Sequence, residues 1–169
     1  MPDGEALFAL TSPTIFDGSR FHTDHCVLLR GERIERVLPR RDCPADIEWV
    51  TLPGGTLAPG FVDLQVNGGG DVMLNAQPTP DAVERIVAAH RGKGTTSLLP
   101  TVISDTREVQ AEAVEAVRAA RAAGNASVLG IHIEGPFFAA NRRGAHREDH
   151  IRRATADDIA WLCSLDEFP

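Results

Sequence analysis

The sequence predicts an α/β fold in which a small β-sandwich-like domain precedes the first three βα units of a (β/α)8 TIM barrel. Three observations favour it: short β-like runs early in the chain, alternating strand-like and helix-like segments from Ala58 onward, and matching polar stripes on two of the later strands. A complete barrel takes roughly 250 residues. The 169 residues here therefore lead us to expect an unfinished barrel.

The first domain, residues 1–54, is expected to be a small antiparallel β domain. The β-like runs are 6–10, 26–30, 34–38 and 47–52, and Arg30-Gly31-Glu32 resembles a hairpin connection. Four short strands hardly close a core, so we expect this domain to be incomplete. Pro53-Gly54-Gly55 punctuates the chain, and the second domain is expected to span 55–169.

The second domain is expected to alternate strands with helices, in the order strand 60–67, a helix from Pro80 closed by Gly92 or Gly94, strand 95–101, helix 106–123, strand 128–134 and a final helix capped by Thr155. Thr79 before Pro80 is typical of a helix start. Asp105 with Glu108 resembles a capping arrangement for the next helix. We interpret Gly68-Gly69-Gly70 as a tight turn rather than an anion-binding nest.

The third strand carries a carboxylate to its end. Because successive strand residues point to opposite faces, Leu129, Ile131 and Ile133 share one face, which a helix would cover, and His132 and Glu134 share the other. Gly135-Pro136 then stops the strand. In parallel α/β folds, functional sites lie at this carboxyl end.

The first strand repeats this pattern, with apolar residues at 62, 64 and 66 and polar residues at 63, 65 and 67. A parallel sheet buried on both faces should be almost continuously apolar, so two polar stripes need an explanation. We expect Gln65 and Asn67 to meet Glu134 in one cavity.

Composition excludes several classes of function. The net charge of −7 and the pI near 5.3 argue against nucleic-acid binding, and no apolar run is long enough for a membrane span. The first five residues are polar and acidic, unlike a secretory signal. Three cysteines without metal-ligand spacing indicate reduced thiols, so we expect a cytoplasmic protein.

Three stretches resemble the amidohydrolase superfamily, and within it the N-acetylglucosamine-6-phosphate deacetylases. They are residues 57–70 (LAPGFVDLQVNGGG), 94–101 (GTTSLLPT) and 130–137 (GIHIEGPF), the last followed by Gly144-Ala145-His146. The wider superfamily would show two histidines where this chain has Gln65 and Asn67. Amides are poor ligands for transition metals, so one divalent metal (Zn, Fe or Mn) is expected instead of two.

The resemblance also implies roles for individual residues. Glu134 would be a ligand of the metal, His146 would hydrogen-bond the acetyl carbonyl of the substrate, and Gln65 and Asn67 would line the substrate pocket. We expect His132 to orient Glu134 or to pack inside the barrel. The run Arg142, Arg143, Arg147, Arg152 and Arg153 is either an attraction for a sugar phosphate or a solvated loop.

The reaction implied by the resemblance is hydrolysis of N-acetylglucosamine 6-phosphate to glucosamine 6-phosphate and acetate. The general acid/base aspartate and two histidine ligands are expected beyond Pro169, so no catalytic residue is assigned within this chain. We therefore expect a truncated chain that binds metal weakly and turns over little. The full-length family is expected to form homodimers that act on a small amino-sugar phosphate.

Two alternatives stay open. Another amidohydrolase, acting on a cyclic amide, would share the first strand but would be expected to keep both histidines at 65 and 67. The chain could instead be a non-catalytic interaction module with an open sheet edge.

Overall fold

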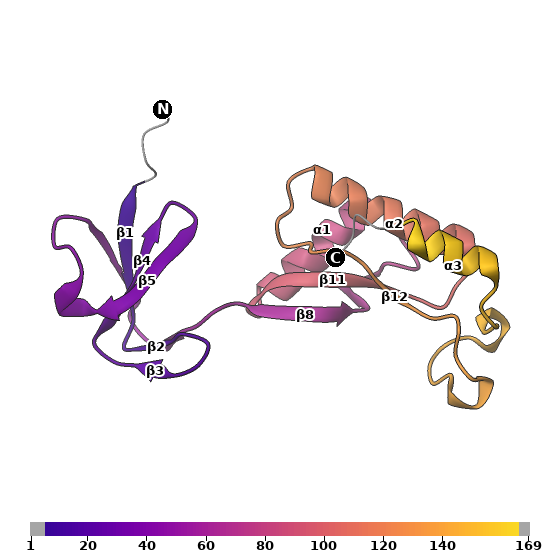
Figure 1. Cartoon of the computed structure of the whole chain (residues 1–169), viewed down its shortest axis with the longest axis horizontal. Helices are drawn as coiled ribbons and strands as arrows, with labels where there is room; N and C mark the ends of the chain where they lie inside the picture. Colours follow the sequence, from indigo (N-terminus) through magenta and orange to yellow (C-terminus); the bar gives the residue numbers. More distant parts are fainter. Residues whose placement is uncertain (1–5, 166–169) are drawn as a thin grey trace. The chain divides into compact units, whose positions relative to one another are not determined.

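The computed structural model describes residues 6–165, and the chain divides after Pro59 into two compact units (Figure 1). This division lies a few residues beyond the expected boundary at Pro53-Gly54-Gly55. The reason is that strand β7 (Thr56–Leu57) still pairs with strand β2 (Thr14–Phe16) of the first unit. Within the described residues, no helix is both long and apolar enough to cross a bilayer.

The main sheet of the first unit contains all four of the predicted runs. Its strand order is β5-β4-β1-β6, formed by Arg33–Pro39, His25–Arg30, Leu7–Thr11 and Glu48–Thr51. The predicted hairpin joins β4 to β5, and Gly31 at its turn has φ of +55°, a conformation that glycine adopts without strain.

The expectation of an antiparallel sheet was only partly right, because β6 runs parallel to β1. After β5 the chain passes through a short 3-10 helix (Arg40–Asp42) and crosses to the far edge of the sheet, so β6 enters in the same direction as β1. A second, three-stranded sheet of order β3-β2-β7, with β3 at Phe21–His22, was not predicted. Its strands are too short to give a clear alternating pattern.

Two cysteines belong to the core of the first unit. Cys26 and Cys43 are buried with Ala9, Leu28 and Leu38, and both are free thiols. Burial, followed by a hydrogen bond with Cys43, raises the pKa of the Cys26 thiol to about 12. Cys26 therefore stays protonated and unreactive at neutral pH.

The second unit is a three-stranded parallel sheet with two helices on one face (Figure 1). The strand order is β12-β11-β8, formed by His132–Glu134, Thr95–Ile103 and Phe61–Val66. Helices α1 (Pro80–Arg91) and α2 (Arg107–Ala122) pack on this sheet and on each other. The result is an α/β layer whose other face is free to carry polar side chains.

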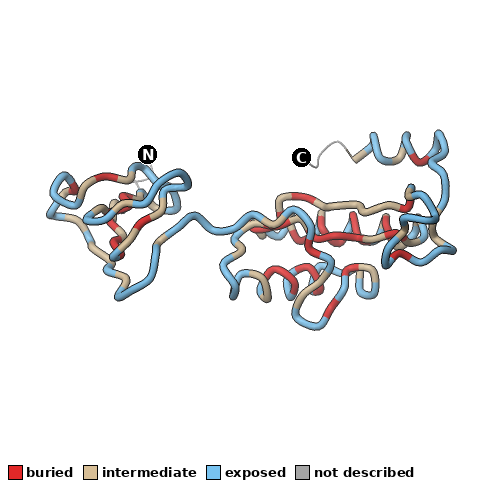
Figure 2. Tube along the Cα trace, turned by 90° about the horizontal axis from the view of Figure 1, so that it is seen from below, coloured by how far each residue is buried: buried red, intermediate tan, exposed pale blue. Residues whose placement is uncertain are grey.

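Aliphatic side chains fill the space between the sheet and the helices. Leu98 and Val102 of β11 pack with Val83 and Ile86 of α1 and Val117 of α2, and all five are at most 1% exposed. Figure 2 shows buried stretches along the strands and the helices of this unit. Each such side chain contributes roughly 1.5–3 kcal/mol when buried, so this cluster stabilises the unit.

Helix α1 begins as predicted, because the Thr79 hydroxyl accepts a hydrogen bond from the Ala82 N–H. Before it, β9 (Gly68–Gly69) and β10 (Val72–Met73) form a tight hairpin. The glycines thus make a turn rather than an anion nest. The ring of His90, on α1, bonds the carbonyl oxygen of Gly68 at 2.9 Å and holds this hairpin against the helix.

The predicted cap of α2 was wrong. Thr106, rather than Asp105, occupies the cap position, and its hydroxyl accepts from the Val109 N–H. Asp105 instead accepts a hydrogen bond from Asn75 at 2.9 Å. A carboxylate with this long-range partner is not available to cap the helix.

The third predicted strand is interrupted. Leu98 pairs with Val128, but Thr101 pairs with His132, so three steps along β11 (98 to 101) correspond to four steps on the other strand (128 to 132). The extra residue is a bulge, so the residues before it face the opposite way from the predicted alternation, whereas Ile131 and Ile133 pack against the core as predicted. Val128, rather than Leu129, is therefore buried in the core.

The apolar face predicted on β8 is only partly covered. Val66 is 2% exposed, whereas Val62 and Leu64 are 58% and 62% exposed. The cluster that buries Val66 includes Val72 and Leu74, from the segment that follows the strand. Among the described residues, nothing covers the beginning of the strand on this side.

Helix α3 (Ala156–Cys163) is held by a buried carboxylate. Thr155 caps it as predicted, in a capping box with Asp158. Asp158, which is 3% exposed, also pairs with Arg107 of α2 and with Arg152, and the Arg107 guanidinium lies 3.9 Å from the Trp161 ring centroid. These contacts fix α3 to the start of α2.

We expect one of the three thiols to react with DTNB in the native protein. Cys163 is exposed, whereas burial and the high pKa of Cys26 protect the core pair. Absorbance titration should count one thiol per chain before denaturation and three after it. Cys163→Ser should abolish the native reaction; two or three rapidly reacting native thiols would contradict the buried pair.

Replacing Asp158 by Asn should loosen α3. Hydrogen bonds from Arg152 and Thr155 hold the pKa of the Asp158 carboxyl well below its ordinary value. A lowered folded pKa stabilises the protein at neutral pH, and this contribution disappears as the pH falls below about 3.8, the ordinary value. Backbone amides of α3 should exchange at least about tenfold faster in the variant at neutral pH.

The matched control for this experiment is Asp157→Asn, at the exposed neighbouring position. Urea denaturation should show Asp158→Asn destabilised at neutral pH and increasingly similar to the unmodified chain at strongly acidic pH. Equal effects of the two substitutions would show that Asp158 does not hold the helix.

Candidate active site

Glu134, at the end of β12, is the centre of the site. Its Oε2 accepts a hydrogen bond from Gln65 Nε2 at 2.9 Å, and its Oε1 lies 3.3 Å from His146 Nε2. Gln65 comes from β8 and His146 from the loop after β12. The structure therefore brings together three of the four residues that the sequence singled out.

The fourth residue, Asn67, lines the same cavity as Glu134 and His146. The cavity has a volume of about 400 Å³, within the range of about 300–1,000 Å³ usual for small-molecule sites. Its other lining residues are Met73, Ile103, Phe138, Arg142, Arg143, Gly144 and Ala145. The site thus lies at the carboxyl ends of the parallel strands, where the polar stripes predicted it.

His146 is held rigidly. It is 8% exposed, its ring lies 4.5 Å from the Phe138 ring, and its carbonyl oxygen accepts a hydrogen bond from Arg143. The Ser104 N–H donates to His146 Nδ1 at 3.4 Å. Since Nδ1 is an acceptor, the proton of the neutral ring is on Nε2, which faces Glu134. His146 is therefore set up as a hydrogen-bond donor into the cavity.

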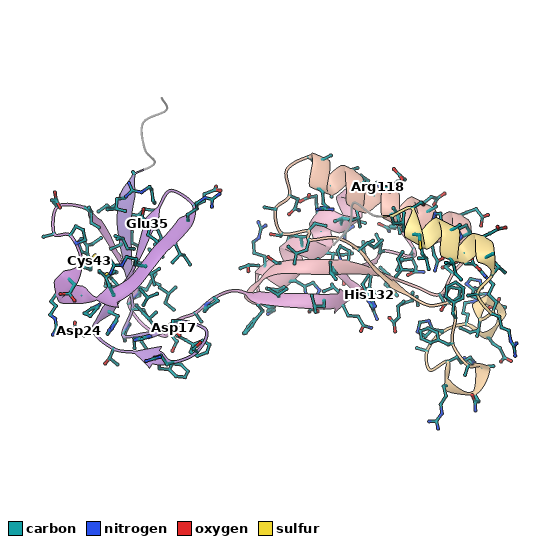
Figure 3. All side chains as sticks on the ribbon, in the orientation of Figure 1. Asp17, Asp24, Glu35, Cys43, Arg118 and His132 are labelled. Atoms are coloured by element: carbon teal, nitrogen blue, oxygen red, sulfur yellow. The ribbon has the colours of Figure 1, made fainter. Side chains whose placement is uncertain are left out.

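His132 makes no hydrogen bond with Glu134 within the described residues. Its Nδ1 lies 3.3 Å from the hydroxyl of Thr101, its partner on β11, and Figure 3 shows the residue at the sheet, away from α1 and α2. Of the two roles that the sequence left open, packing on the inner face of the sheet is the one that the contacts support. The side chains that contact the Glu134 carboxylate and orient it are those of Gln65 and His146.

The bend after β12 requires glycine. Gly135 has φ of +89°, and a Cβ there would lie 2.2 Å from the Ser104 hydroxyl oxygen and 2.6 Å from the Phe138 ring. Ser104 also donates its hydroxyl to the Glu134 carbonyl oxygen at 3.4 Å. The close packing at Gly135 therefore brings Ser104 and Phe138 against the end of the strand that carries Glu134.

Sequence reasoning missed a second polar group beside the cavity. Asn75 accepts from the Ile103 N–H at 2.9 Å and donates to Asp105. His150 Nδ1 lies 3.5 Å from Asp105 Oδ1 and 3.3 Å from the Ser104 carbonyl oxygen. These contacts tie three loops to the end of β11. Asp105 follows the end of a strand, as Asn67 does. This position at a strand end is the sequence feature that could have identified Asp105 as part of the polar group.

Comparison with known proteins gives a consistent picture. Residues 7–57 match the model of the NagA composite domain, and residues 56–165 match that of the amidohydrolase family. The chain is 35% identical to the N-acetylglucosamine-6-phosphate deacetylase of Haemophilus influenzae over 156 residues, covering 92% of this chain and 41% of that protein. It is 38% identical to the N-acetylgalactosamine-6-phosphate deacetylase of a Shewanella species over 149 residues, covering 85% and 36%.

Solved structures agree with this comparison. The N-acetylglucosamine-6-phosphate deacetylase of Pasteurella multocida superposes with a TM-score of 0.89 at 30% identity, covering 95% of this chain and 42% of that one. A mutant of the Mycobacterium smegmatis enzyme, in complex with N-acetyl-D-glucosamine-6-phosphate, gives 0.83 at 29% identity, covering 96% and 41%. The chain thus spans about two fifths of the length of these relatives.

The tautomer of His146 can be tested directly. We expect long-range proton–nitrogen NMR correlations, recorded at alkaline pH where imidazoles are neutral, to place the proton on Nε2. Glu134→Gln should leave this assignment unchanged, because the Ser104 N–H still donates to Nδ1. A proton on Nδ1 would mean that Ser104 does not set the orientation of the ring.

Proposed function

Because the chain belongs to the amidohydrolase family, we propose that it contributes part of the active site of a deacetylase acting on N-acetylglucosamine 6-phosphate. The products would be glucosamine 6-phosphate and acetate. The observation that carries this proposal is that Gln65 and His146 both hold Glu134, which lines one cavity together with His146. An amide-held carboxylate beside a fixed hydrogen-bond donor suits hydrolysis of an amide.

The architecture that we propose is the first part of a (β/α)8 barrel preceded by a β domain. Two features support it: α1 and α2 lie on the same face of the parallel sheet, as in a barrel wall, and polar residues occupy the opposite face. A doubly wound sheet would have helices on both faces.

Glu134 is suited to be one ligand of a divalent metal. Its side chain is 23% exposed, and a carboxylate that accepts two hydrogen bonds keeps further lone pairs. Zn, Fe and Mn all accept such a ligand. Within residues 6–165 there is no group of three or more His, Cys, Asp or Glu that could hold a metal. The remaining ligands would come from elsewhere in the enzyme.

A bound metal would polarise the acetyl carbonyl and lower the pKa of a bound water. The residues of this chain do the positioning. Gln65 holds one oxygen of Glu134 through its side-chain amide. His146 would donate its Nε2–H, which faces Glu134 in this structure, to the acetyl carbonyl oxygen, where negative charge develops. A donor of this kind typically contributes about 10²–10³ in rate.

Proton transfer is not assigned to any described residue. From the resemblance to the deacetylases, we propose that the general acid/base aspartate comes from a part of the enzyme other than residues 6–165. Phe138, packed on the His146 ring, would keep that donor aimed and shield it from water.

A second candidate substrate is N-acetylgalactosamine 6-phosphate, on which the Shewanella relative acts according to its name. The two sugars differ only at C4, and the acetyl group and the phosphate are the same. The arrangement of Glu134 and His146 fits either sugar, because both residues are proposed to act at the acetyl group.

Other activities are less well supported. A cyclic amidase would be expected to have a metal-ligating histidine at position 65. Here Gln65 occupies that position, and its side-chain amide donates a hydrogen bond to Glu134. A purely structural module would have no need of a polar cavity with a fixed donor. We further propose a cytoplasmic location, from the three free thiols, and a homodimer, from the resemblance alone.

The function can be tested in a chimera in which this chain replaces the matched segment of the Haemophilus influenzae deacetylase. We expect acetate release from N-acetylglucosamine 6-phosphate, and we expect Glu134→Gln to reduce it at least about 100-fold. Glu112→Gln, an exposed position on α2, is the matched control and should retain activity. A folded chimera that releases no acetate from either sugar phosphate would refute the proposal.

A further inference from the structure

Ser104, the residue that follows β11, lies between two histidines of the loop after β12. Its N–H donates to His146 Nδ1 at 3.4 Å, and its carbonyl oxygen lies 3.3 Å from His150 Nδ1. Ser104 is 3% exposed, so both of its backbone polar groups need partners within the protein. The two histidines supply these partners and hold the peptide groups on either side of Ser104.

His150 differs from His146 in the role of its Nδ1. This nitrogen faces two acceptors, the Ser104 carbonyl oxygen and, at 3.5 Å, Asp105 Oδ1. Neither oxygen can donate while Asp105 is ionised, so Nδ1 of His150 carries a proton in the neutral as well as in the charged ring. His150 is therefore a donor to Ser104, whereas His146 is an acceptor from it.

The carboxylate beside His150 is fixed independently of the loop. Asp105 Oδ2 accepts from Asn75 Nδ2 at 2.9 Å, and Oδ1 accepts from the Thr106 N–H at 2.9 Å. The side chains of His150 and Asp105 are 18% and 23% exposed, which limits the competition from water. His150 thus docks against an acceptor that other segments of the unit already hold in place.

Other contacts hold the path of the loop. The Arg152 N–H donates to the Pro136 carbonyl oxygen at 3.2 Å, and the Arg152 guanidinium pairs with the buried Asp158. Neither contact involves the imidazole of His150. Loss of that ring would therefore leave the loop in place but release the Ser104 carbonyl oxygen, and with it the backbone that donates to the catalytic-site histidine.

We propose that His150 is a positioning residue for the deacetylation: through Ser104, it keeps the His146 ring turned so that its Nε2–H points into the cavity. Among the described residues, His146 lines that cavity and His150 does not, so the effect of His150 must pass through Ser104. His146 donates to the acetyl carbonyl only under the proposed function, on which this inference therefore rests. The contacts from His150 to Ser104 and from Ser104 to His146 do not depend on it.

The contacts can be tested on the 169-residue chain with two variants of similar shape. In His150→Asn, the side-chain amide nitrogen takes the place of Nδ1 and can donate, whereas His150→Leu has the same branching but no donor. By NMR, the Ser104 amide should exchange with solvent about tenfold faster in His150→Leu and at about the unmodified rate in His150→Asn. The Val117 amide of α2 should exchange equally in all three chains.

Equal exchange of the Ser104 amide in His150→Leu and His150→Asn, whether fast or slow, would overturn the proposal, because the donor would then make no difference. If His150→Leu does not fold, His150→Met provides a second side chain of suitable size without a donor.

The effect on catalysis can be measured in the deacetylase chimera. A group that acts on the transition state through His146 should change kcat rather than KM. We expect His150→Leu to lower kcat about tenfold with KM unchanged, and His150→Asn to restore it. In a chimera that already carries His146→Gln, His150→Leu should cost nothing further. An additional loss in that background would indicate a general structural role and overturn the proposal.

The outcomes separate this proposal from the proposed function. If Ser104 exchange responds to His150→Leu but the unmodified chimera releases no acetate, the contacts stand and the deacetylase function fails. If the chimera is active but His150→Leu leaves kcat unchanged, the function stands and His150 is not a positioning residue.

Discussion

The hydrogen bond between Gln65 and Glu134 is the contact on which the rest of the site depends. It joins the first and third strands of the parallel sheet across β11, between residues 69 positions apart. It forms only if both strands run in the same direction, end at the same level and turn these side chains to the same face. The same contact leaves Oε1 of Glu134 facing His146, so that the loop after β12 is drawn against the sheet.

Much of this arrangement could be predicted from the sequence, because it depends on short-range patterns such as strand alternation, helix caps and turns. Alternation along β8 placed Gln65 opposite Val66, and the Gly-Pro pair after Glu134 marked the end of the strand. Thr79 before Pro80 marked the start of α1, and the turn at Gly31 marked the hairpin. Each of these patterns involves residues that are close together in the sequence, where backbone preferences determine the secondary structure.

The parts that could not be predicted all depend on distant partners. Aspartate is a common helix-cap residue, but the carboxylate of Asp105 accepts a hydrogen bond from Asn75, thirty positions earlier. The parallel placement of β6 depends on the path of the chain across the sheet, which leaves no pattern in the strand itself. The bulge before β12 could not be predicted from the sequence either, because a bulge is defined by the pairing of this segment with β11.

That extra residue has an evolutionary consequence. Between Val128 and His132 the chain holds one position more than its neighbour needs, and the bulge takes up this residue before the strand reaches Glu134. Loss of a single codon there would restore a regular ladder and leave Glu134 opposite Ile103, still facing the cavity. Loss of a second would turn the carboxylate toward the helices, so homologous enzymes that keep the glutamate should have either this bulge or a regular strand one residue shorter.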